Sequence, residues 1–256
     1  MVLDLPPPMS DANPAAQWHD PAFVQHFLQN VRGAIPLTIE QIDMMLRVIA
    51  AAREPVGNFI VLGCGDSLLA SAILDEHPAA RGFLIDDSDA SIESARRHLS
   101  EHADRLRFVR ADVTKPGWMN AVAAGIPFDA AISGAAIPHS TDECKRVLYR
   151  EVFELLTPEG IFINLEHVAS ATRWTESEWD DRMIEAIFGQ QLREAPRDAR
   201  VDVARAYYAQ VSHDADALAP LEVQCDWLRE IGFENVECFL KVQELAMFGG
   251  QKPGTK

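Results

Sequence analysis

The chain has 256 residues, 48% of them hydrophobic and 24% charged, which is enough for one α/β domain with a modest elaboration. Its formal net charge of -16 and its isoelectric point near 4.8 disfavour binding to the phosphate backbone of a nucleic acid. The four cysteines are widely spaced and form no Cys-x-x-Cys pair, so we predict no metal site and no disulfide framework. Because no apolar run reaches the ~20 residues of a membrane span and no signal peptide pattern opens the chain, we expect a cytoplasmic protein with no membrane partner.

The N-terminal part predicts a tail followed by two helices. Residues 1–16 are rich in Pro, Asp and Asn, a composition typical of a flexible tail. Residues 17–55 predict two helices that form part of a cap, and the second begins at Thr38, which makes a capping box with Gln41. The apolar residues expected on one face of this helix are Ile39, Ile42, Leu46 and Ile49.

Residues 56–168 predict a cofactor-binding core. The continuous apolar run at 59–62, which ends at Gly63, is typical of a parallel strand buried on both faces. Strands and helices then alternate, which predicts an α/β fold with an open, doubly wound sheet. The further elements expected are a helix at 68–76, a strand at 83–85, a helix at 89–101, strands at 106–109 and 128–133, a helix with the capping box 140–143 that stops at 157–160, and a strand at 161–165.

The last third of the chain interrupts this alternation and then returns to it. Residues 169–219 are helical in pattern, charged and rich in aromatic side chains, and we interpret them as a helical lid. Residues 220–256 predict a helix at 221–231 and two closely connected strands. So short a connection implies an antiparallel C-terminal hairpin, which gives a mostly parallel sheet of seven strands.

The ends of three predicted strands carry residues suited to a nucleoside. Gly63 and Gly65 follow the first strand, where missing β-carbons let the backbone approach a ligand. Asp86 ends the second strand, about twenty residues farther on, where a carboxylate can accept both ribose hydroxyls. Asp112 follows the third strand and is placed to accept the exocyclic amine of an adenine. Taken singly, a tight turn, a helix N-terminal carboxylate and a turn residue explain these positions, but together they predict one crevice.

From Phe59 onward the sequence resembles the class I S-adenosylmethionine-dependent methyltransferases. The resemblance implies a Rossmann-like methyltransferase fold with S-adenosylmethionine as cofactor, S-adenosylhomocysteine as product and a small molecule as methyl acceptor. Two positions depart from the family, since Val61 replaces an acidic residue and Ser67 replaces the third glycine, so we expect the methionine end to be held differently. The matching stretches are Ile-Val-Leu-Gly-Cys-Gly (60–65), Leu-Ile-Asp-Asp-Ser (84–88), Arg-Ala-Asp-Val (110–113), Phe-Asp-Ala-Ala-Ile-Ser (128–133) and Leu-Leu-Thr-Pro-Glu-Gly (155–160).

The resemblance also implies particular cofactor contacts. Cys64 is expected to pack there and not to act as a nucleophile. The implied contacts are Gly63, Cys64 and Gly65 with the amino-acid end of the cofactor, Asp86 with the ribose, Asp87 and Ser88 beside the adenosine, Asp112 and Val113 with the adenine, and Ser133 and Gly134 with the methionine portion.

Methyl transfer needs an in-line nucleophile, a dry pocket and often one base. Three residues after predicted strands are candidates for that base or for substrate contact: His139, Glu166 and His167. Only one of Glu166 and His167 is expected to face the crevice, because side chains alternate along a strand. The lid residues that we expect to complete the acceptor pocket are Arg205, Tyr207, Tyr208 and His213.

Other functions stay open at this point. The layout of the chain also resembles the carboxy-S-adenosylmethionine synthases, in which Arg205 would hold an additional carboxylate. A non-catalytic protein that binds S-adenosylmethionine or S-adenosylhomocysteine is a further alternative, since Val61 and Ser67 weaken the usual loop. A nicotinamide-dependent oxidoreductase is disfavoured, because the Gly-x-Gly-x-x-Gly pattern fails at Leu68. A homodimer is compatible with each of these functions.

Overall fold

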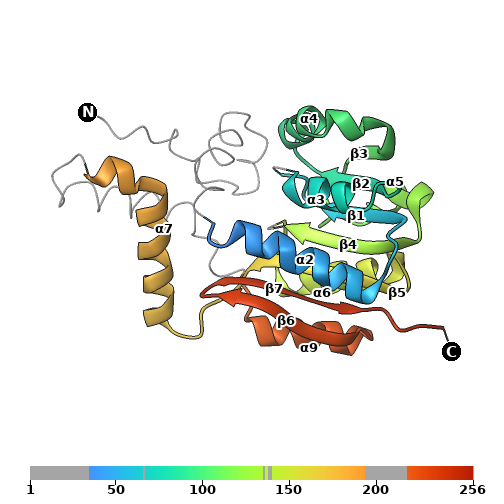
Figure 1. The fold of residues 1–256 in the computed structure, drawn as a ribbon. Coiled ribbons are helices and arrows are strands. Elements are labelled where there is room, and N and C mark those ends of the chain that lie inside the picture. The colour runs from blue at the N-terminus through green and yellow to red at the C-terminus, as the bar shows by residue number, and fades with distance from the viewer. Residues whose placement is uncertain (1–34, 66, 135, 138–139, 194–217, 256) are drawn as a thin grey trace.

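The structure, a computed structural model, describes residues 35–65, 67–134, 136–137, 140–193 and 218–255 (Figure 1). Its seven strands are β1 (Asn58–Leu62), β2 (Arg81–Asp86), β3 (Leu106–Arg110), β4 (Phe128–Gly134), β5 (Leu156–His167), β6 (Glu234–Val242) and β7 (Leu245–Gln251). Its α-helices are α2 (Thr38–Ala52), α3 (Leu68–Glu76), α4 (Asp89–His98), α5 (Met119–Val122), α6 (Asp142–Leu155), α7 (Arg173–Arg193) and α9 (Leu221–Ile231).

The seven strands form one sheet in the order β3-β2-β1-β4-β5-β7-β6. Strands β1 to β5 pair in parallel, whereas β7 pairs antiparallel with both β5 and β6. The predicted doubly wound sheet with an antiparallel C-terminal hairpin is therefore confirmed. The strand order reverses between β2 and β4, on either side of β1, and ligands of such sheets bind outside the carboxyl ends of the strands at this point.

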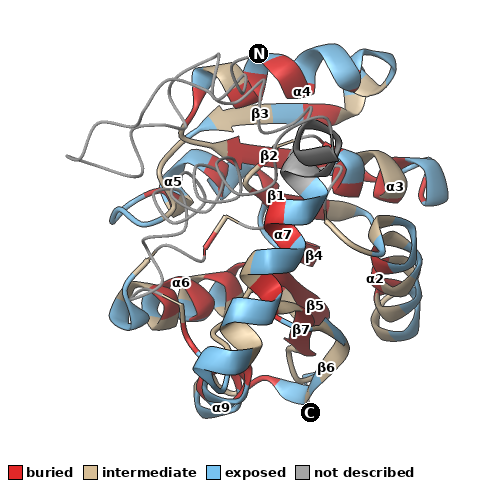
Figure 2. Ribbon diagram, turned by 90° about the vertical axis from the view of Figure 1, so that its left-hand side faces the viewer, coloured by how far each residue is buried: buried red, intermediate tan, exposed pale blue. Residues whose placement is uncertain are grey.

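Two apolar layers cover the sheet, one on each face. Leu62 and other alternate residues of the strands pack with α6 and α9, whereas Val61 and its counterparts pack with α2, α3 and α4. Figure 2 shows the central strands as buried between these helices. Burial on both faces explains why the sequence of β1 reads as a continuous apolar run and not as an alternation.

The start of α2 differs from the prediction. The hydroxyl of Thr38 donates to the carbonyl of Ile35, and the side-chain amide of Gln41 donates to the carbonyl of Pro36. The two side chains therefore form no capping box. Because the bond to Pro36 satisfies the Gln41 amide, the side chain can be buried, and Ile39 is left 80% exposed. The residues of α2 that are buried are Gln41, Met45 and Ile49.

The elements around the β4–α6–β5 unit are shifted from their predicted ends. The N-cap of α6 is Thr141 and not Ser140, because the Thr141 side chain accepts the N–H of Cys144. Strand β5 begins at Leu156, within the stretch that we expected to be a turn. Glu159 has φ 65°, which bends β5. After this bend the strand continues through the predicted apolar run at 161–165.

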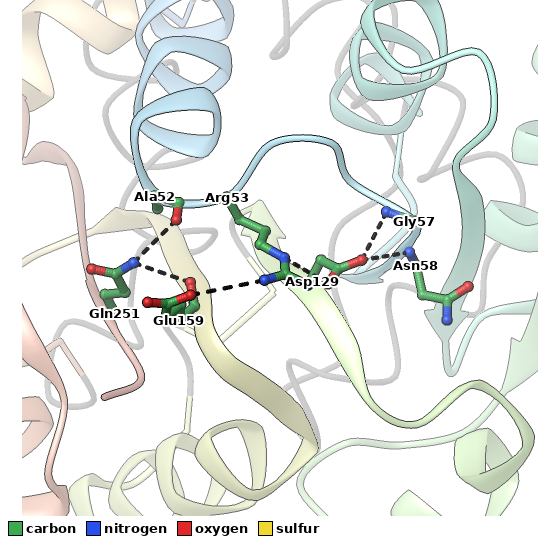
Figure 3. Close-up of polar contacts among 7 residues, drawn as sticks. All are labelled: Ala52, Arg53, Gly57, Asn58, Asp129, Glu159 and Gln251. Atoms are coloured by element: carbon green, nitrogen blue, oxygen red, sulfur yellow. Dashed lines mark hydrogen bonds and ion pairs between the residues drawn. The ribbon is translucent and has the colours of Figure 1, made fainter. Parts of the chain in front are cut away.

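A carboxylate at the amino ends of the strands ties β1 to β4 (Figure 3). Asp129 Oδ2 accepts the N–H of Gly57 at 2.7 Å and the N–H of Asn58 at 3.0 Å. Asp129 Oδ1 accepts Nε of Arg53, which follows α2, at 3.1 Å. Asp129 belongs to a stretch that resembles the methyltransferase family, but its place at the amino end of β4 gives it a structural role away from the crevice.

Helix α7 lies on the carboxyl-end side of the sheet, within the stretch predicted as a lid. In Figure 1 it stands apart on the side to which β4 points, and Figure 2, viewed from that side, shows it in front of β4 and β5. The N–H of Ala169 donates to the carbonyl of Ala219 at 3.2 Å, which brings the two ends of this stretch together. No helix in the described ranges, α7 included, is long and apolar enough to cross a membrane.

Candidate functional site

Two glycines shape the turn after β1. Gly63 has φ 77°, and a β-carbon there would lie 2.5 Å from the β-carbon of Ala136, so no larger residue fits. Gly65 has φ 39°, and apart from its chain neighbours no atom of the described residues lies within 4 Å of the place where its β-carbon would be. The backbone at Gly65 therefore faces open space, which lets a ligand approach it closely.

Asp86 is joined to this turn by hydrogen bonds. Its Oδ2 accepts the N–H of Cys64 at 3.0 Å, and its Oδ1 accepts the N–H of Ser88 at 2.9 Å. Burial raises the pKa of the Asp86 carboxyl above its ordinary value, and the two N–H groups act in the opposite direction. Oδ2 also accepts the thiol of Cys64 at 3.5 Å, whereas Oδ1 keeps a second lone pair, so Asp86 can still accept a hydroxyl group of a ligand. The glycine turn and Asp86 thus form one unit.

The side chains of Cys64 and Ser88 point into the protein. Cys64 is 2% exposed, and burial, together with the neighbouring Asp86 carboxylate, raises the pKa of its thiol. A thiol that stays protonated is not a nucleophile, in agreement with its expected packing role. Ser88 is fully buried, and its hydroxyl accepts the N–H of Ser91 at the start of α4. The half-buried Asp87 lies between Asp86 and this cap.

Asp112 lies at the same edge, beyond β3. Asp86 pairs with Arg110 in the parallel ladder, which places Asp112 two residues past the partner of Asp86. Its Oδ1 accepts both the N–H and the hydroxyl of Thr114, at 2.9 and 2.6 Å, so Asp112 is also the turn residue that a simpler interpretation expects. Val113, next along the loop, lines a cavity of about 260 Å³ between this loop and α6.

The end of β4 contributes the buried hydroxyl of Ser133 and a backbone segment at Gly134 that packs closely against α3. Ser133 pairs with Leu62, directly before the glycine turn, and is fully buried. Its Oγ has no hydrogen-bond partner within the described part of the chain. A β-carbon at Gly134 would lie 2.8 Å from Leu69 of α3, so the backbone there packs closely. An unpaired buried hydroxyl beside the turn suits a polar ligand group.

Glu166 is buried in the interior between β5 and α6. It is fully buried and accepts the N–H of His167 at 2.8 Å, and the Asn164 amide lies 3.5 Å from its Oε2. Burial raises the pKa of Glu166 to about 8, and burial lowers the pKa of the nearby Lys145, whose side chain is also inaccessible. These groups form a buried polar cluster and are shielded from the crevice.

His167 points to the opposite side of β5 and is the more accessible of the two. Its side chain is 27% exposed, and its Nε2 lies 2.7 Å from Oε2 of Glu244, a residue with only 4% of its side chain exposed. The ring of Trp179 in α7 packs against the His167 ring, with 5.7 Å between the centroids. Sequence reasoning missed Glu244, because only the pairing of His167 with Leu245 brings the two together.

The remaining predicted residues lie outside the described residues. They are His139, Arg205, Tyr207, Tyr208 and His213. The structure therefore brings together the glycine turn, Asp86 and Asp112 at one edge of the sheet, and Ser133 and His167 end neighbouring strands at that edge.

Comparisons with known proteins agree with this arrangement. Residues 60–160 match the family described as "Methyltransferase domain". Over this stretch the chain is similar to the methyltransferase domains of that family. The cofactor of that family is S-adenosylmethionine, and the matched residues run from the first predicted strand to the start of β5.

Two related proteins align with different shares of the chain. The release factor glutamine methyltransferase of Mycobacterium leprae (strain TN) is 32% identical over 143 residues, 52% of this chain and 47% of that protein. The chain thus aligns with about half the length of this relative. The trans-aconitate 2-methyltransferase of Acidovorax sp. (strain JS42) is 24% identical over 237 residues, which cover 84% of this chain and 80% of that protein.

Solved structures confirm the fold of the methyltransferase domain. An O-methyltransferase family protein from Burkholderia thailandensis superposes with a TM-score of 0.66 at 16% identity, covering 99% of this chain and 67% of that chain. Human N-acetylserotonin methyltransferase, solved in complex with SAM, gives a TM-score of 0.57 at 14% identity and covers 96% of this chain and 60% of that one. At these identities the similarity shows a shared Rossmann-like methyltransferase fold.

Proposed function

We propose that this chain binds S-adenosylmethionine and transfers its methyl group to a small molecule. The observation that carries the proposal is the hydrogen bond between the Asp86 carboxylate and the backbone of an open glycine turn. This bond places an acceptor for ribose hydroxyls beside backbone that a ligand can approach. The matches to methyltransferases over most of the chain support the same activity.

The residues present fit the cofactor in three respects. Gly65 leaves room for the amino-acid end, Asp86 Oδ1 retains a lone pair for a ribose hydroxyl, and the Ser133 hydroxyl, which is unpaired among the described residues, suits the methionine portion. Asp112 and Val113 would meet the adenine from the end of β3. When bound, S-adenosylmethionine supplies a methyl group on a positively charged sulfur that an in-line nucleophile displaces.

His167 is the residue that we assign to the acceptor. It stands at the carboxyl end of β5 and carries a titratable ring held by Glu244. Asp86 and His167 are separated by β1 and β4 in the sheet, so the adenosine and the acceptor would approach from different sides of the crevice. The small-molecule acceptor of the trans-aconitate relative supports a small molecule here as well.

Binding of S-adenosylmethionine to the Asp86→Asn variant tests the proposal. The amide keeps the shape of the side chain but replaces one acceptor oxygen by a donor, and hydrogen bonds to a charged group contribute about 1.5–3 kcal/mol. We therefore expect the Kd measured by isothermal titration calorimetry to rise about 10- to 100-fold. The exposed Glu93→Gln on α4 changes the net charge equally and should leave the Kd unchanged. A folded Asp86→Asn protein with wild-type affinity, or a wild-type protein that does not bind, would refute the proposal.

The alternatives have no support of their own in the structure. A carboxy-S-adenosylmethionine synthase would depend on Arg205, which lies outside the described residues. A non-catalytic binder would show the same Asp86 dependence without methyl transfer, so release of S-adenosylhomocysteine in the presence of acceptors separates the two functions. Cytoplasmic localisation and a homodimer stay predictions.

A further inference from the structure

Three side chains that no sequence motif connects meet beyond the carboxyl end of β5. They are His167 at the end of β5, Glu244 in the turn directly before β7 and Trp179 in α7. The ring of Trp179 lies against the His167 ring, and the carboxylate of Glu244 contacts Nε2 of His167. We call these three residues the acceptor cluster.

The pair formed by His167 and Glu244 has the features of an oriented base. A buried carboxylate 2.7 Å from Nε2 accepts the proton of that nitrogen and fixes the orientation of the ring. The other nitrogen, Nδ1, is then an acceptor, and the structure gives it no hydrogen bond within the described residues. A histidine held by a carboxylate in this way can take a proton from a group placed at Nδ1.

Trp179 supplies a donor with no acceptor in the described part of the chain. The residue is 5% exposed, and its Nε1 has no hydrogen-bond partner among the residues that the structure describes. A buried N–H without a partner costs about 1–3 kcal/mol, so such a group indicates a missing acceptor. The contact between the two rings, with 5.7 Å between their centroids, brings the Trp179 side chain next to His167.

A hydroxyl group satisfies both positions at once. Its oxygen can accept the Trp179 N–H while its hydrogen is donated to Nδ1 of His167. A carboxylate cannot donate to the base, and a neutral amine has a single lone pair, which it needs to attack the methyl group and cannot also offer to the indole. The hydrogen-bonding requirements of the acceptor cluster therefore favour a hydroxyl over the two other common methyl acceptors.

The charge around the acceptor cluster points the same way. Burial raises the pKa of Asp180, the neighbour of Trp179, to about 6, and the carboxylates of Glu244 and Glu176 raise it further while His167 lowers it. An anionic acceptor would add to this negative charge and would bind more weakly. A neutral hydroxyl compound would not.

We propose that the acceptor cluster binds and deprotonates the hydroxyl group of a small molecule, so that the chain is an O-methyltransferase of phenol-like acceptors; this rests on the proposed function. His167 takes the proton and Glu244 acts as its positioning residue. As the new bond forms between the acceptor oxygen and the methyl carbon, the carbon–sulfur bond breaks and its electron pair stays on sulfur. The hydroxyl proton passes to Nδ1, and the imidazolium is paired with the Glu244 carboxylate.

Three panels of substituted benzenes, matched in size, test the class of acceptor. Phenols, benzoates and benzylamines are incubated with the full chain and S-adenosylmethionine, after calorimetry has shown that the cofactor binds, and S-adenosylhomocysteine is measured. We expect turnover with phenols alone. Turnover confined to benzoates or benzylamines, or no turnover on any panel with the cofactor bound, would overturn the inference and leave the cofactor site intact. Failure of the cofactor to bind would refute the proposed function itself.

Variants of the acceptor cluster test the roles of its members. General bases contribute about 100- to 10,000-fold, so His167→Gln should lower kcat at least 100-fold for a weakly acidic phenol. The loss should shrink to below about tenfold for a nitrophenol that is already ionised at the assay pH, because no proton remains to be removed. A merely structural role would lower kcat equally for both phenols, and that result would contradict the inference.

The positioning role of Glu244 has its own readout. Glu244→Gln should lower kcat about 10- to 100-fold with little change in KM, and Glu244→Asp, which keeps the charge, should recover part of the loss. Trp179→Phe removes the N–H together with the five-membered ring of the indole and should raise KM for phenols. The exposed Glu185→Gln on α7 serves as the control and should behave as the wild type. Equal activity in Glu244→Gln and the control would remove Glu244 from the mechanism.

Discussion

Replacement of Asp129 by alanine should destabilise the protein without affecting its ligand site. The substitution removes the acceptor of two backbone N–H groups, those of Gly57 and Asn58, and one bond to Arg53. The Arg53 side chain is 37% exposed, so its ion pair contributes only about 0.5 kcal/mol. The two N–H groups are partly accessible, which lets water replace some of each bond, and we take about 1.2 kcal/mol for each. The expected loss in the free energy of unfolding is about 3 kcal/mol.

Urea unfolding followed by circular dichroism measures this loss, provided that the m-value is unchanged. Asp129→Asn, which keeps one acceptor oxygen, should lose about half as much. Glu159→Gln is the matched control, because its contact with Arg53 is 4.0 Å long and its side chain is 63% exposed. Since Asp129 lies at the amino end of β4, the Kd for S-adenosylmethionine should not change. A loss below about 1 kcal/mol, or a weakened Kd in the folded variant, would refute this reasoning.

Three further substitutions test the turn and the buried cluster. Gly65→Val should weaken S-adenosylmethionine binding more than about tenfold in calorimetry, because the side chain would fill the open space beside a backbone with φ 39°; retained affinity would show that the ligand binds elsewhere. Ser67 has φ 66° and a buried hydroxyl without a partner among the described residues, so Ser67→Gly should raise the free energy of unfolding by about 1 kcal/mol, which a higher Tm would reveal and a lower Tm would contradict. The pKa of Glu166 is raised to about 8, so between the pKa of the unfolded chain and pH 8 the folded state holds a proton that the unfolded state has released. Stability should therefore fall as the pH rises through that range, and Glu166→Gln should flatten the fall in urea titrations at pH 5.5, 6.5 and 7.5; parallel pH profiles would argue against a raised pKa.

Local patterns were sufficient to predict the framework of the site. The buried run before Gly63 marks a central parallel strand, and Asp86 ends the next strand at a fixed distance in sequence. The carboxyl ends of parallel neighbours lie at one edge of the sheet, so strand order and residue spacing are enough to place these two residues together. Capping and turn chemistry are also local, which is why α3 and α9 begin and end where the sequence indicates.

The buried face of α2 was harder to predict from the same patterns, because it involves a single side-chain hydrogen bond. The exposed Ile39 has the spacing of a core residue, and the buried Gln41 does not. The bond from the Gln41 side chain to the carbonyl of Pro36 gives its amide a partner, so Gln41 can be buried on the same face as Met45 and Ile49. Periodicity records the hydrophobicity of each position but not whether a polar group has found a partner.

The amino-acid sequence by itself determined the α/β class, the order of the elements and the three strand ends that carry the glycines and the two aspartates. Only the tertiary structure decided that Glu244 meets His167, that Trp179 joins them, and that Asp129 holds the opposite edge of the sheet. The physical reason is the range of the interactions: helix, turn and strand preferences act between residues close in the chain, whereas the partner of His167 is 77 residues away and is brought to it by antiparallel pairing of β5 with β7.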